Sequence, residues 1–190
     1  MTAGPGRGGV GSENRGGRRF VRIRSIMSKS AGWGVGGTLA GLGVATLHAG
    51  HPVQTLASFA VVSLVEGLWI GLIGVGARLR DLRAASPGPP DAQYLRASWF
   101  GSPVLPLVLA ATALAAVAAL RHQALLAGAC AGVSGGFALT FGLLARLYDV
   151  AETRTRRRYW APGRGLGGPV SFTSVGRQPG GDREDPDHDD

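Results

Sequence analysis

The chain has 190 residues, of which 45% are hydrophobic and 17% are charged, and its formal net charge at pH 7 is +8. Its apolar windows are too long for ordinary core helices, which argues against a soluble domain and favours a polytopic membrane protein. The only cysteine, Cys130, lies inside an apolar window, so an intrachain disulfide and a thiolate metal site are excluded. Arginine outnumbers lysine 19 to one, and Ala and Gly are abundant, a bias that indicates a bacterial source with GC-rich DNA.

The N-terminal segment, residues 1–30, is basic and carries seven Arg and Lys residues. Its first 19 residues are rich in Gly and Arg and lack apolar periodicity, which predicts disorder. Residues 18–29 mix cations with apolar side chains, as residues 154–160 do near the other end of the chain. Such segments determine topology and anchor a protein at anionic lipids, where each cation near the surface contributes about 1 kcal/mol to membrane binding. A nucleic-acid contact is the alternative, but no recognition motif accompanies the charge.

Four apolar windows are long enough to cross a hydrocarbon core, which needs roughly 20 helical residues for about 30 Å. The predicted spans cover residues 31–49, 55–77, 102–120 and 124–146. Connections of a few residues follow the first and third spans, so the spans form two short-looped hairpins. The first span contains six glycines, which lower its hydropathy. An alternative is a signal peptide ending near Ala49, which would leave three spans.

The distribution of positive charge predicts the orientation. Residues 1–30, the 78–101 loop and residues 146–190 hold 19 of the 20 Arg and Lys residues, and Arg121 is the exception. By the positive-inside rule, both termini lie in the cytoplasm. The C-terminal segment, residues 149–190, begins basic and ends acidic, and its Gly, Pro and charge predict a disordered tail. We expect Tyr148, Tyr159 and Trp160 to lie at the membrane interface as aromatic anchors.

Small residues recur at spacings of three and four within the spans, a pattern that lets helix backbones approach closely in lipid. These stripes predict packing within the bundle or against a second subunit. The candidate packing residues are Gly32 and Gly36 in the first span, Gly67 and Gly71 in the second, and Gly128 and Gly132 in the fourth.

Glu66 is the only strongly ionisable residue in the interior of a predicted span. A central charge costs about 2.5 to 3.5 kcal/mol on insertion scales, which the surrounding apolar residues offset. If the spans alternate in direction, Thr112 and Ser134 lie at the depth of Glu66, and Ser63 precedes it by one turn. We therefore expect one intramembrane polar site made of Ser63, Glu66, Thr112 and Ser134. Glu66 would serve there either as an interhelical hydrogen-bond donor or as a proton or cation site.

No motif predicts catalysis, a cofactor or a metal. Two G-x-G-x-x-G matches, within residues 32–37 and 163–168, follow no strand of a βαβ unit. His48, His51 and His122 could in principle bind zinc or sense pH, but the short outer loops supply no carboxylate, so we expect ordinary interfacial histidines. No nucleophile elbow, zinc-protease or paired-acid pattern occurs.

The sequence therefore predicts an all-α, four-helix bundle in a bacterial cytoplasmic membrane, composed of residues 31–148 with disordered ends. The expected role is non-enzymatic, through helix association with itself or with a membrane complex, and with anionic lipids at the cytoplasmic face. The alternative is a small proton- or cation-coupled transporter or channel subunit that uses Glu66.

Overall fold

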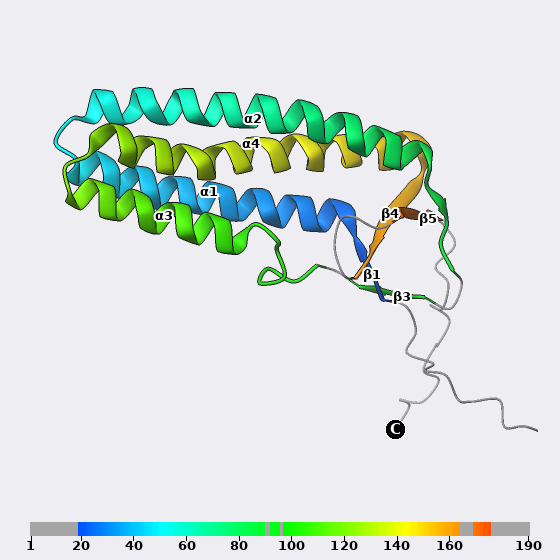
Figure 1. Cartoon of the computed structure of the whole chain (residues 1–190). Helices are drawn as coiled ribbons and strands as arrows, with labels where there is room; N and C mark the ends of the chain where they lie inside the picture. Colours follow the sequence, from blue (N-terminus) through cyan, green and yellow to red (C-terminus); the bar gives the residue numbers. More distant parts are fainter. Residues whose placement is uncertain (1–18, 90–91, 96, 164–168, 176–190) are drawn as a thin grey trace, which may run out of the picture.

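A bundle of four helices dominates the computed structural model, which describes residues 19–89, 92–95, 97–163 and 169–175. Figure 1 shows the helices side by side along one direction, with a small sheet at one end. The helices are α1 (Ile23–His48), α2 (Pro52–Arg83), α3 (Leu105–Leu120) and α4 (Ala124–Thr155). The prediction of a mostly helical chain is confirmed. The predicted disorder of residues 1–18 and 176–190 lies outside the described residues.

Each predicted apolar window coincides with one helix, and three of the helices continue beyond it at the end nearest the sheet. The apolar windows end where charged residues begin, but the backbone hydrogen bonds that define a helix continue through the charged residues. Among the described residues, only α2 and α4 are long and apolar enough to cross a membrane by themselves. Helix α1 does not meet this criterion because its glycines lower its hydropathy, and α3 does not meet it because it has only 16 residues.

Helix α4 is the centre of the bundle, because it packs against each of the other three helices. It runs parallel to α2, with Gly128 beside Thr55, and antiparallel to α1, with Gly34 beside Ala138. Helix α3 fills the angle between α1 and α4, whereas α1 and α2 touch each other only sparsely. A seam therefore separates α1 from α2.

Five short strands form one mixed sheet at the end of the bundle where the chain enters and leaves it (Figure 1). Their order across the sheet is β2-β5-β4-β1-β3. The strands are β1 (Arg19–Arg22), β2 (Ser86–Pro87), β3 (Gln93–Leu95), β4 (Arg157–Pro162) and β5 (Ser171–Ser174). Strand β4 is central and pairs antiparallel with both β1 and β5.

The sheet corrects two expectations. The chain is not purely α-helical, and the described parts of residues 1–30 and 149–190 are ordered, because they form β1, the start of α1, the end of α4, β4 and β5. The strands have two to six residues and contain Pro and Arg, so no alternating pattern marks them. They are stabilised by pairing between distant segments, such as Val21 with Ala161, which local composition does not reveal.

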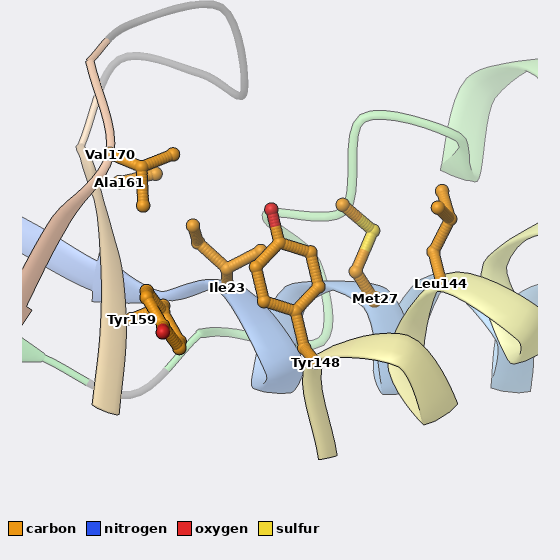
Figure 2. Packing of buried hydrophobic residues seen from close by; sticks show 7 residues of the cluster. All are labelled: Ile23, Met27, Leu144, Tyr148, Tyr159, Ala161 and Val170. Carbon is orange, nitrogen blue, oxygen red and sulfur yellow. The ribbon is translucent and has the colours of Figure 1, made fainter. Parts of the chain in front are cut away.

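A buried apolar cluster joins the sheet to the helices. Figure 2 shows Tyr148 of α4 projecting between Ile23 and Met27 of α1, with Tyr159 of β4 close by. The Tyr148 and Tyr159 rings meet edge to face, with centroids 6.1 Å apart. Tyr148, Tyr159 and Trp160, which the sequence predicted as membrane-interface residues, are all buried within the protein. Their rings build the junction between sheet and bundle.

One ion pair ties three elements together at this junction. The Arg22 guanidinium of β1 donates to both carboxylate oxygens of Glu152 in α4, with 3.3 Å from Nε to Oε1. The backbone N–H of Tyr159 in β4 donates to the same Oε1 at 3.3 Å. Only 7% of the Glu152 side chain is exposed. Because a buried charge is costly without partners, this pair fixes the sheet against the bundle.

Candidate functional site

Glu66 lies in the central part of α2, on the side that faces α4, and its side chain is half-buried. The carboxyl group rests over Gly136, where an added Cβ would lie 2.9 Å from Oε2. Among the described residues, no hydrogen bond or ion pair reaches the Glu66 carboxyl group. This arrangement does not support the role of an interhelical hydrogen-bond donor.

The predicted polar cluster is divided between two faces of α4. Ser63 accompanies Glu66 on the α2 side and donates to the Gly132 carbonyl oxygen at 3.0 Å. Ser134 and Thr112 meet on the other side, where each hydroxyl lies 3.1 Å from the Cβ that would be added at Gly37 of α1.

This division corrects the expectation of one site. Ser134 and Gly136 are two residues apart in a helix and therefore point about 200° apart.

The small-residue stripes also differ in their surroundings. Gly128 and Gly132 of α4 lie against the backbone of Thr55 and Phe59 in α2, while Gly67 and Gly71 of α2 receive Leu139 and Leu143 of α4. Both stripes therefore lie between α2 and α4, where close approach needs the missing side chains.

On α1 the stripe that packs inward is Gly34, Gly37 and Gly41, and not the stripe predicted from Gly32 and Gly36. Gly32 is covered by the Trp99 ring, and Gly36 faces open space. A helix rich in glycine all round gives no indication of which face turns inward, so the rotation of α1 about its axis could not be predicted.

A cavity of about 330 Å³ occupies the half of the seam nearest the sheet, between α1, α2 and α4. Its walls are mainly apolar, with Met27 from α1, Ile70 from α2, and Phe137, Phe141 and Leu144 from α4. The volume lies within the range of small-molecule sites, which is roughly 300 to 1,000 Å³.

The polar groups of the cavity are few. Arg78 and Asp81 of α2 stand at the end nearest the sheet, where Arg78 Nη1 donates to Asp81 Oδ2 at 2.8 Å. Thr140 of α4 lines the wall and is buried, and its hydroxyl has no hydrogen-bond partner among the described residues. Ile70 lies one helical turn beyond Glu66, so Glu66 precedes the cavity on the same face of α2. The cavity thus lies between the Glu66 carboxyl group and the Arg78–Asp81 ion pair.

Sequence reasoning missed this cavity because its residues come from three helices and form no local pattern. Met27 lies in the basic segment before the first predicted span and Phe141 lies in the fourth span, and the cavity forms where α1 and α2 touch each other only sparsely. Comparison with known proteins adds no relative, since no family model, no curated protein and no solved structure matches the chain.

Proposed function

We propose that this chain is a four-span integral membrane protein with both ends in the cytoplasm, and that it acts without catalysis by associating with a second copy of itself. The membrane placement is supported by large apolar side chains exposed on the bundle, including Trp69 (70%) and Leu72 (72%) on α2. Soluble monomers rarely expose extended apolar patches, whereas lipid would cover them. All four helices lie alongside one another, so the lipid layer around α2 and α4 would also enclose α1 and α3 (Figure 1).

The charge distribution supports the orientation. Apart from Arg121, every Arg and Lys among the described residues lies at the end of the bundle that carries the sheet. Arg121 lies between α3 and α4, at the opposite end. The positive-inside rule therefore assigns the sheet to the cytoplasm.

The outward face of α1 carries the association proposal. Of the three small-residue stripes, those of α2 and α4 are used inside the bundle, whereas Gly36 and Gly43 of α1 face open space. Leu39 and Leu47 on the same face are 70% and 80% exposed, beside these two gaps. A face with both projections and gaps can pack against its own copy about a two-fold axis.

Gly36→Leu is expected to convert the dimer into a monomer, because the leucine fills the gap that the partner helix would enter. The measurement is the fraction of dimer in native membranes, from cross-linking of Gly43→Cys in a Cys130→Ala background. Gly76→Leu is the matched control, since Gly76 also faces open space but lies on α2. A monomeric parent protein, or equal loss of dimer in both leucine variants, would contradict the proposal.

A second candidate function rests on Glu66 alone. A half-buried carboxyl group without a partner among the described residues, placed beside a cavity, is suited to exchange a proton or hold a cation. In that case Glu66→Gln abolishes proton-linked flux in reconstituted vesicles while the helical content stays unchanged. Flux at background level with the parent protein would rule out this function and leave self-association as the proposal.

A further inference from the structure

We infer that the cavity between α1, α2 and α4 binds one acyl chain of an anionic phospholipid from the cytoplasmic leaflet, with the headgroup beside Arg78. This inference rests on the membrane placement proposed above, but it does not require the protein to be a dimer. Its basis is the combination of apolar walls, an opening along the seam and a cationic end.

The walls fit a hydrocarbon chain. Met27 and Leu144 are buried behind the cavity, Phe137 and Phe141 form one side, and Gly74 of α2 leaves room on the other. Protein interiors are close-packed and leave few voids larger than a water molecule. The space here has a volume of about 330 Å³ and is lined mainly by apolar side chains. In a bilayer, the acyl chains of the surrounding lipids can fill this space.

The cavity opens toward the lipid and not toward the bundle axis. It lies in the seam between α1 and α2, which touch each other only sparsely. Ile70 lines it and is nevertheless 41% exposed. A lipid chain can therefore enter sideways from the bilayer without opening of the bundle.

Electrostatics favour a negative headgroup. Three carboxylates are described at the sheet end of the bundle, and each is already in an ion pair: Asp81 with Arg78, Asp149 with Arg24 and Arg146, and Glu152 with Arg22. The remaining arginines at this end, which include Arg80 and Arg83 on α2, leave an excess of positive charge. Basic pockets between helices on the cytoplasmic side attract anionic headgroups, and guanidinium binds phosphate oxygens in pairs.

The test uses the full-length protein, purified, stripped of lipid and titrated with phosphatidylglycerol or phosphatidylcholine in detergent micelles. Native mass spectrometry measures how much of each lipid the protein retains. We expect phosphatidylglycerol to bind more tightly. Gly74→Leu should weaken its binding at least about tenfold, because the leucine fills the chain site. The matched control is Gly76→Leu, which adds the same side chain outside the cavity and should leave binding unchanged.

Arg78→Gln should reduce the preference for phosphatidylglycerol over phosphatidylcholine about fivefold, because one cation near an anionic headgroup contributes about 1 kcal/mol to binding. Arg78→Lys should restore most of this preference. Equal retention of the two lipids by the parent protein would overturn the inference, as would unchanged binding in Gly74→Leu. Labelling of Val53→Cys by an impermeant reagent outside intact cells tests the membrane placement separately. A chain that is labelled there but shows no lipid preference contradicts this inference alone.

Discussion

Gly128→Ala is expected to destabilise the bundle by about 3 kcal/mol, the upper part of the usual range for overpacking. A Cβ at this position would clash with the Thr55 carbonyl oxygen and with Ser58 Oγ. The Ser58 hydroxyl can rotate away, but the Thr55 carbonyl belongs to the backbone of α2. The two helices must therefore separate over their whole contact, and the measurement is the free energy of unfolding in a denaturing-detergent titration followed by circular dichroism.

Gly142→Ala is the matched control on the same helix. No heavy atom of the described residues lies within 4 Å of the Cβ that would be added there. Alanine should stabilise α4 at this position by about 0.5 to 1 kcal/mol, because it restricts the unfolded chain more than glycine does. If both variants changed stability in the same direction and by the same amount, close contact between α2 and α4 would not be what stabilises the bundle.

Glu152→Ala is expected to cost about 3 kcal/mol, at the lower end of the range for breaking a buried ion pair, because Arg22 is 29% exposed and keeps some hydration. The substitution leaves the Arg22 guanidinium and the Tyr159 N–H without their acceptor. Detachment of β1 and β4 should follow, measured as earlier thermal unfolding and as faster proteolysis between residues 156 and 163.

Two variants make this second result specific. Arg146→Ala breaks the ion pair with Asp149, but Arg146 is 76% exposed, so the change should stay within about 1 kcal/mol. Glu152→Gln keeps an oxygen acceptor for Tyr159 N–H and loses the charge, so its stability should lie between those of the parent and Glu152→Ala. Equal effects of Glu152→Ala and Arg146→Ala would show that the sheet is not fastened by this pair.

The two expected effects arise from different physics at the two ends of the molecule. At the far end from the sheet, the buried core is made of alanines, including Ala45, Ala118 and Ala127, and the helices approach closely because little stands between them. At the sheet end, aromatic rings and a charged pair fill a wider space. The cavity between α1, α2 and α4 lies in this half of the bundle.

The positions of the four helices follow from the sequence alone. A run of apolar residues bounded by charge marks a helix, and the short stretches 49–51 and 121–123 between helices agree with the predicted hairpins. Hydropathy is a local property, so a window of about 20 residues carries this information. The contrast between an arginine-rich end and an arginine-poor end is likewise read directly from the residues.

The rotation of α1 about its own axis was decided only by tertiary packing. Gly34 and Gly37 of α1 turn inward while Gly36 turns outward, although all three look alike in an apolar helix. The sheet and the cavity were decided in the same way, because they bring together residues as distant as Val21 and Ala161, or Met27 and Phe141. Composition determines which segments are helical, but contacts between distant segments depend on shape and on backbone pairing, which local composition does not encode.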